Sequence, residues 1–152
     1  MFISDLENRF RTVFASSSII LTGSLSGSGA LYGVGLQVGV DDANYEPPTV
    51  IFFANKSTEE IPGTQAHNVS MNIQLQTPGS ETATTHIARC RLIESWLKSY
   101  APTSLSYSAL ADALTSGSIK VYGCIPTDTT QMPQQDKFVY NIEIATYAQP
   151  LS

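Results

Sequence analysis

The stretch HNVSMNIQLQ, residues 67–76, decides the fold because apolar and polar residues alternate along it without a break. Alternation with a period of two is the pattern of a β-strand with one buried face. The buried face takes Val69, Met71, Ile73 and Leu75, and the other face takes Ser70, Asn72, Gln74 and Gln76. The run TVIFFA at 49–54 is apolar without alternation, which is typical of a strand buried on both faces. We expect these two segments to pair antiparallel.

Helical patterns flank this pair. A capping-box pattern at Ser4 to Glu7 precedes apolar residues at helical spacing up to Phe14, with Glu7 on the polar side. A second helix is expected from Ser80 to about Tyr100, and a shorter one at 107–115. Further strands are expected at 19–21, 119–125 and 138–146. Polar loops are expected at 55–66, between the first two strands described, and at 126–136, between the last two.

Residues 1–152 therefore predict a single α+β domain. Its sheet is mostly antiparallel, with about four to five strands covered by two main helices. Residues 23–48 form a glycine-rich excursion, a loop or hairpin that we expect to lie outside the core and to serve function or partner contact.

Composition excludes several classes of function. The net charge is −5 and the eight basic residues are scattered, so tight nucleic-acid binding is not expected. No apolar run is long enough to span a membrane, and the N-terminus lacks the pattern of a secretory signal. The sequence indicates an intracellular protein in which Cys90 and Cys124 fill the core as free thiols.

Motifs for chemistry are few. The turn at 27–33 superficially resembles a dinucleotide-binding loop, but it lacks the helix and the distant acidic residue of that fingerprint, so no cofactor is expected. His67 and His86 have no metal-ligand pattern around them. Cys90 follows His86 by four residues and shares a helix face with it, yet no third group completes a nucleophilic site. No catalytic residue is predicted, and the protein is not expected to be an enzyme.

Two acidic pairs, Asp41 with Asp42 and Glu59 with Glu60, lie in predicted loops. Adjacent carboxylates in a loop are usually solvated charge, which is our first interpretation. The alternative is that they contact a neighbouring subunit or face a channel.

The order of elements resembles that of the tail terminator proteins of long-tailed bacteriophages, also called tail completion, neck or head-tail joining proteins. The resembling pieces cover most of the chain outside the excursion: the helix 4–14, the PPTVIF entry at 47–52, the strand 67–77, the helix from Ser80, VYGC at 121–124 and the strand 138–147. The excursion at 23–48 departs from the shortest members.

The resemblance implies a virion protein, assembled in the host cytoplasm, that forms a ring, commonly a hexamer. Such a ring caps the tail tube, joins it to head-tail connector proteins, and lets DNA pass without specific binding. It implies no catalytic residues. Two other functions stay open: a tail tube or baseplate subunit, and a small enzyme that binds a nucleotide through the glycine-rich loop.

Overall fold

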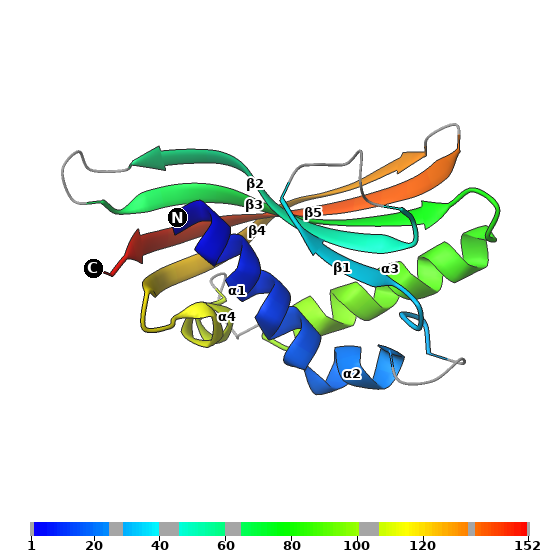
Figure 1. The fold of residues 1–152 in the computed structure, drawn as a ribbon, viewed down its shortest axis with the longest axis horizontal. Coiled ribbons are helices and arrows are strands. Elements are labelled where there is room, and N and C mark those ends of the chain that lie inside the picture. The colour runs from blue at the N-terminus through cyan, green and yellow to red at the C-terminus, as the bar shows by residue number, and fades with distance from the viewer. Residues whose placement is uncertain are drawn as a thin grey trace.

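The computed structural model describes residues 2–24, 29–39, 46–59, 65–100, 107–133 and 136–151 (Figure 1). Its elements, in chain order, are α1 (Phe2–Ser16), α2 (Ser18–Ser24), β1 (Gly35–Val38), β2 (Thr49–Glu59), β3 (His67–Pro78), α3 (Ala83–Lys98), α4 (Ser108–Leu114), β4 (Ile119–Pro133) and β5 (Lys137–Pro150). The predicted α+β class is confirmed. The helices number four among the described residues, where two main ones were expected.

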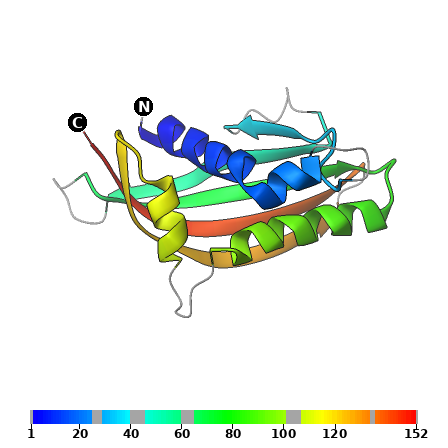
Figure 2. The same ribbon diagram turned by 90° about the horizontal axis from the view of Figure 1, so that it is seen from below.

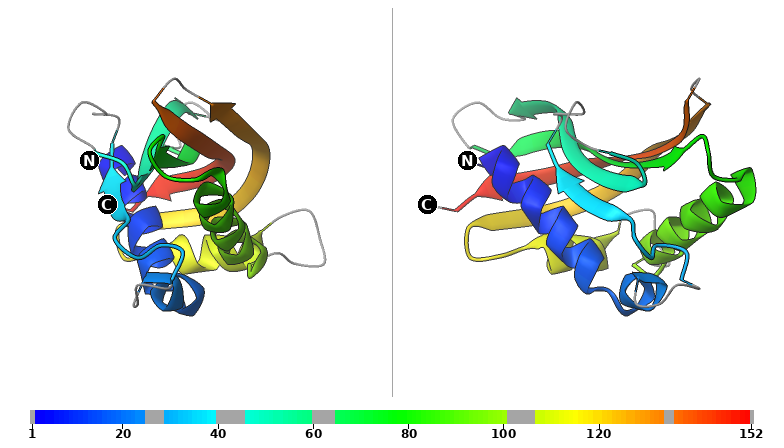
Figure 3. Two further views of the ribbon diagram at one scale, coloured as in Figure 1. Left: turned by 90° about the vertical axis from the view of Figure 1, so that its right-hand side faces the viewer. Right: turned by 45° about the vertical axis from the view of Figure 1, so that its right-hand side comes forward.

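The strands form one five-stranded sheet in the order β1-β2-β3-β5-β4. Three pairs are antiparallel, including the predicted β2–β3 pair, and β1 lies parallel to β2. The helices gather on one side of the sheet (Figure 2). The long strands β4 and β5 bend around the side on which α3 lies (Figure 3).

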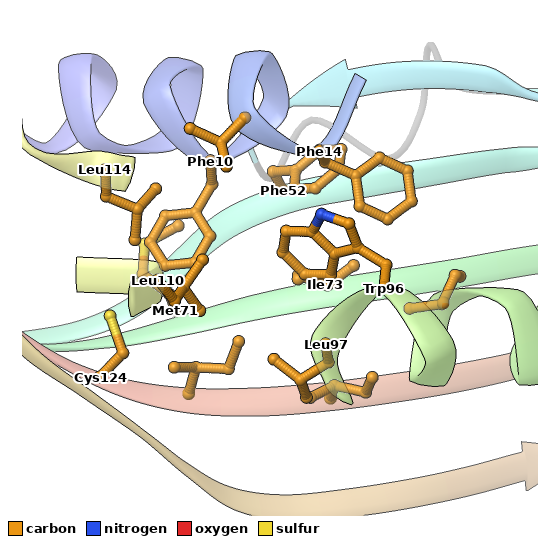
Figure 4. Close-up of a cluster of buried hydrophobic side chains, with 14 of the residues drawn as sticks. Phe10, Phe14, Phe52, Met71, Ile73, Trp96, Leu97, Leu110, Leu114 and Cys124 are labelled. Carbon is orange, nitrogen blue, oxygen red and sulfur yellow. The ribbon is translucent and has the colours of Figure 1, made fainter. Parts of the chain in front are cut away.

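The core lies between the helices and the alternating residues of the central strands. Val69, Met71, Ile73 and Leu75 of β3 are all buried, as the alternation predicts. Phe14 of α1 and Trp96 of α3 meet above the sheet, with ring centroids 5.0 Å apart, and Phe14 also contacts Phe52 of β2 (Figure 4). These aromatic contacts join both long helices to the sheet.

Several local predictions are wrong. Residues 19–21 belong to the helix α2 rather than to a strand, and α1 begins at Phe2, so Ser4 lies inside the helix rather than at its N-cap. Strand β2 runs on to Glu59 and β4 runs on to Pro133, into the segments predicted as loops. Both extensions are polar, and each is held by the register with its partner strand.

The described part of the excursion is not peripheral, which corrects the expectation that 23–48 lies outside the core. Leu31 is buried in the core, and Leu36 and Val38 of β1 pack against it. Gly33 and Gly39 adopt positive φ angles of 78° and 87°, which glycine tolerates best, on either side of β1. The segment contains a strand, as its apolar residues suggested, but this strand pairs in parallel with β2.

Candidate functional site

A polar cluster surrounds the buried side chain of His86, in the first half of α3, and reaches the surface at Gln131. We call His86, Cys90, Thr77 and Gln131 the His86 cluster. Nδ1 of His86 lies 2.8 Å from the hydroxyl of Thr77 on β3, and Nε2 lies 3.3 Å from Oε1 of Gln131 on β4. The thiol of Cys90 lies 3.5 Å from Nε2. The ring of Phe138 on β5 stacks on the imidazole at 5.3 Å. The predicted pairing of His86 with Cys90 is therefore present.

The hydrogen bonds of this cluster suit neutral groups. Oε1 of Gln131 is an acceptor, so Nε2 of His86 carries the proton and donates to it. Nδ1 of His86 then accepts from the Thr77 hydroxyl. The oxygen of that hydroxyl accepts in turn from Nη1 of Arg89 at 3.3 Å. Burial lowers the pKa of His86 against the opposing hydrogen bond to Gln131, and the charge of Arg89 lowers it further. Burial also raises the pKa of the Cys90 thiol, although the hydrogen bond from Gln131 acts the other way. A reactive cysteine needs a lowered pKa, so this pair has the reverse of a nucleophile's electrostatics.

The second thiol, Cys124 of β4, is fully buried, and burial raises its pKa to about 12. Both cysteines are free and buried, in agreement with the prediction that they fill the core. His67 stands at the start of β3, with Nδ1 3.1 Å from the Ser57 hydroxyl and its ring 5.2 Å from Phe2. Among the described residues, no three His, Cys, Asp or Glu side chains gather where they could hold a metal ion.

A hollow of about 440 Å³ lies where residues 29–32 of the glycine-rich excursion meet the start of α3. The buried guanidinium of Arg89 lies at its wall, but Nη1 and Nη2 each donate to Glu81 at 3.0 Å and Nε donates to the carbonyl of Ala30. This cation is thus already neutralised by a carboxylate at the same wall, which would also repel a phosphate. Gly29 has a separate reason to be glycine: a Cβ there would collide with the carbonyl oxygen of Gly23.

The predicted acidic sites are placed only in part. Asp41, Asp42 and Glu60 lie outside the described residues. Glu59 is the last residue of β2 and pairs with His67, so it belongs to a strand rather than to a loop.

The face of the sheet away from the helices carries a line of amide side chains that we call the amide ladder: Asn72, Gln74, Gln76 and Asn141. Asn141 donates to Asn72 at 2.9 Å, Gln74 donates to Asn141 at 3.4 Å, and Gln76 donates to Gln74 at 2.8 Å. Lys137 closes the line by donating to Gln76. Asn72 and Gln76 are each only 3% exposed, so the ladder is partly buried. Linked amides of this kind hold one another in place.

Exposed apolar side chains lie on the same face, farther along β4 and β5. They are Tyr122, Ile125 and Tyr147. Gly123 pairs with Tyr147 and Ile125 pairs with Ala145, so these residues share one end of the sheet. Tyr122 stands at a bulge, and its hydroxyl donates to Gln149 at 2.8 Å. Exposed aromatic residues grouped on a polar face are typical of contact surfaces.

The strand edges, by contrast, are covered at several points by other parts of the chain. On the β1–β2 side, Glu7 accepts from the amide of Ala54 and Arg11 donates to the carbonyl of Leu36. On the β4 side, the Thr115 hydroxyl accepts from the amide of Val121 at 3.1 Å. The amides of Tyr107 and Ser116 donate to the carbonyls of Cys124 and Ile119. We call these contacts the edge caps, and they occupy groups that could otherwise pair with another strand.

Sequence reasoning missed the edge caps and the Arg89–Glu81 pair, because both join residues whose proximity no local pattern signals. Glu7 was expected on the exposed side of α1 and is instead buried, since it reaches the edge of β2. The amide ladder had a signal in the alternating amides of β3, but its partner Asn141 could be found only from the register.

Comparison with known proteins adds no assignment. The sequence matches no model of a known protein family, and a search of curated proteins gives no match. None of the helices in the described ranges is long and apolar enough to cross a membrane.

Proposed function

We propose that this chain is a structural subunit of a virion, a tail terminator or neck protein that forms a ring, joins tail to head and leaves a passage for DNA. The observation that carries the proposal is the group of exposed residues Tyr122, Ile125 and Tyr147 on the sheet face away from the helices, on the same face as the amide ladder. A fold that leaves aromatic side chains on a rigid polar face is suited to contact with another protein.

The chemistry inside the described residues supports a structural role. The pKa shifts of His86 and Cys90 keep both groups neutral, and the two cysteines are buried. Arg89 is held by Glu81, which weighs against the nucleotide-binding alternative. General acid, general base or nucleophilic catalysis requires a side chain that can reach a bound substrate. The side chains of His86 and Cys90 are buried, so they do not meet this requirement.

The charge of the chain fits a passage for DNA. With a net charge of −5 and scattered basic residues, a surface made from this protein repels the phosphate backbone. DNA could then cross a ring of such subunits without being retained. The same charge balance supports the absence of specific binding to DNA in this proposal.

The edge caps favour a connector over a tail tube subunit whose strands would form a continuous barrel between protomers. Such a barrel needs free strand edges on both sides of the sheet. On the β4 side, the Thr115 hydroxyl is hydrogen-bonded to the backbone amide and carbonyl of Val121. On the β1 side, Arg11 donates a hydrogen bond to the carbonyl of Leu36. Subunit contacts through the faces of the molecule avoid this conflict.

Light scattering of the purified protein over a range of concentrations, followed by negative-stain electron microscopy with and without tail tubes, tests the proposal. Closed rings with a central hole, alone or at the end of tubes, are the expected result. A protein that stays monomeric alone and leaves tail tubes uncapped would overturn the proposed function, and long stacked tubes would favour the tube alternative.

A further inference from the structure

We propose that the sheet face away from the helices binds a neutral carbohydrate, in a hollow beside the amide ladder. This hollow has a volume of about 300 Å³, and we call it the ladder hollow. The side chains that line it come from β2, β3, β4 and β5. This binding activity does not depend on the function proposed above, because it needs neither a ring nor a second copy of the chain.

The register of the sheet places an aromatic ring and a carboxylate in this hollow. Phe52 lies in the core, so Phe53, the next residue of β2, points to the opposite face of the sheet. Phe53 is paired with Asn72 of β3, and Asn72 is paired with Glu143 of β5. All three line the ladder hollow. One row of residues across the sheet therefore offers an apolar surface at one end and a negative charge at the other.

Two half-buried amides of the ladder, Gln74 and Asn141, also line the hollow and have hydrogen-bonding capacity left. Gln74 donates to Asn141 and accepts from Gln76. Asn141 donates to the buried Asn72 and accepts from Gln74. A side-chain amide has two N–H donors and two acceptor lone pairs. Beyond these bonds, Gln74 and Asn141 each keep one donor and one acceptor for a ligand, and the ladder holds both amides in position before the ligand arrives.

Two further polar groups in the hollow lack a partner among the described residues. The exposed side chain of Asn55 makes no hydrogen bond there. Oε1 of Glu143 accepts from the Thr127 hydroxyl at 3.2 Å, whereas its second carboxylate oxygen makes neither a hydrogen bond nor an ion pair with a described residue. The described part of the lining contains neither Lys nor Arg, so it disfavours an anionic ligand such as a phosphate.

A neutral sugar matches this combination of groups. Each of its hydroxyls both donates and accepts, which suits the remaining positions of Gln74 and Asn141, and a hydroxyl that donates to the Glu143 carboxylate makes a charge-assisted hydrogen bond. The C–H groups of a sugar ring carry partial positive charge and pack against the negative face of an aromatic ring such as Phe53. The volume of the hollow lies at the lower end of the roughly 300–1,000 Å³ of ligand pockets, which suits one or two sugar rings.

Titration of the isotope-labelled full chain with neutral disaccharides, followed by nuclear magnetic resonance, tests the inference. The probes are lactose, maltose, cellobiose and diacetylchitobiose at millimolar concentration. We expect saturable binding of at least one of them, with chemical-shift changes centred on Phe53, Asn55, Gln74, Asn141 and Glu143.

Two substitutions in the hollow and two outside it identify the groups that bind. Phe53→Ala should weaken binding at least about tenfold, because the aromatic surface is lost, and Asn55→Ala should weaken it about two- to tenfold, because one hydrogen bond is lost. Phe2→Ala and Asn8→Ala change the same residue types on α1, outside the hollow, and should leave binding unchanged. Circular dichroism checks that each variant is folded, and the exposed Asn55 keeps the test valid if Phe53→Ala does not fold.

Three results would overturn the inference. One is that none of the four disaccharides binds, and another is that a disaccharide binds away from the ladder hollow. The third is that the α1 controls weaken binding as much as the variants of the hollow do. Chemical-shift changes at the hollow on titration with arginine amide, without any response to the sugars, would assign the hollow instead to a basic side chain of a protein partner.

Discussion

The carboxylate of Glu7 on α1 accepts a hydrogen bond from the backbone amide of Ala54 on β2, over a distance of 2.8 Å. Strand β1 pairs with β2 only as far as Phe52, so this amide lies just beyond the last residue that β1 covers. A helix side chain thus takes the place of a missing strand. The contact explains why a charged residue is buried in α1.

Replacement of Glu7 by alanine should lower the free energy of unfolding by about 1–3 kcal/mol, because the partly buried amide of Ala54 would lose its acceptor. Glu7→Gln keeps an acceptor oxygen and should cost clearly less. Urea unfolding of both variants at about pH 7 checks the order. An equal loss in the two variants would show that the charge, rather than the acceptor, matters.

The pH dependence of the same residue has a definite sign. Burial raises the pKa of Glu7 above its usual value of 4.5, although the hydrogen bond from Ala54 acts in the opposite direction. The native state therefore holds this proton more tightly than the unfolded chain, and the contribution of Glu7 to stability falls as the pH rises from the unfolded pKa through the folded one. The stability of wild type relative to Glu7→Gln should decrease as the pH rises above 4.5.

His86 should make the protein sensitive to acid. Its pKa is lowered in the folded state, chiefly by burial, so the unfolded chain binds the proton more readily. The stability that neutral His86 contributes is complete above pH 6.5, the usual pKa of a histidine side chain. It is lost as the pH falls through the pKa of His86 in the folded state. Urea unfolding at about pH 7.5 and about pH 5 should show a smaller loss in His86→Gln than in wild type.

The matched control for this measurement is His67→Gln, which changes the other histidine of the chain. If His67→Gln reduces the acid-induced loss as much as His86→Gln does, the assignment to the His86 cluster is wrong.

Gly29 and Gly117 should respond differently to alanine. A Cβ at Gly29 would collide with the backbone of Gly23, whereas nothing lies within 4 Å of a Cβ at Gly117. Gly29→Ala should therefore destabilise the fold by about 1–3 kcal/mol, and Gly117→Ala should stay within about 0.5 kcal/mol of wild type. Thermal unfolding compares them. If Gly29→Ala is fully stable but abolishes saturable nucleotide binding, the nucleotide alternative regains support.

Trp96 should tolerate phenylalanine better than its burial suggests. Its indole N–H is buried and has no hydrogen-bond partner among the described residues. Trp96→Phe removes that unpaired donor and keeps an aromatic ring against Phe14, so a loss of about 1–2 kcal/mol is expected, against about 3–5 kcal/mol for Trp96→Ala. Denaturant unfolding of both variants measures the difference. Equal losses would mean that the nitrogen contributes to stability after all.

The elements with a long internal pattern could be predicted, and the others could not. The alternation at 67–76 was enough to place β3 and its antiparallel partner. Three apolar residues at 19–21 fit a strand or a helix equally well, and α2 forms because its turn bonds to Ser17 and Ser18 and buries Ile20. The parallel pairing of β1 is fixed by its register with β2, and the polar half of β4 is fixed by its register with β5, so neither follows from the residues of the strand alone.

For the candidate sites, spacing within one helix was informative and proximity between elements was not. The four-residue spacing of His86 and Cys90 predicted their contact, but Thr77 and Gln131, which flank the imidazole at hydrogen-bond distance, come from two strands. The hollow beside α3 brings Tyr32 to residues about fifty positions later in the chain. Sites of this kind join residues from different elements, so they can be identified only once the arrangement of the whole fold is known.

The edge caps also follow the order in which the ribosome makes the chain. Helix α1, which supplies Glu7 and Arg11, is complete before β1 and β2 are synthesised, and residues 107–116 precede β4 directly. An edge that emerges before its cover can pair with a neighbouring nascent chain. Here each outer strand leaves the exit tunnel after the segment that caps it, so each cap is already made when its strand emerges.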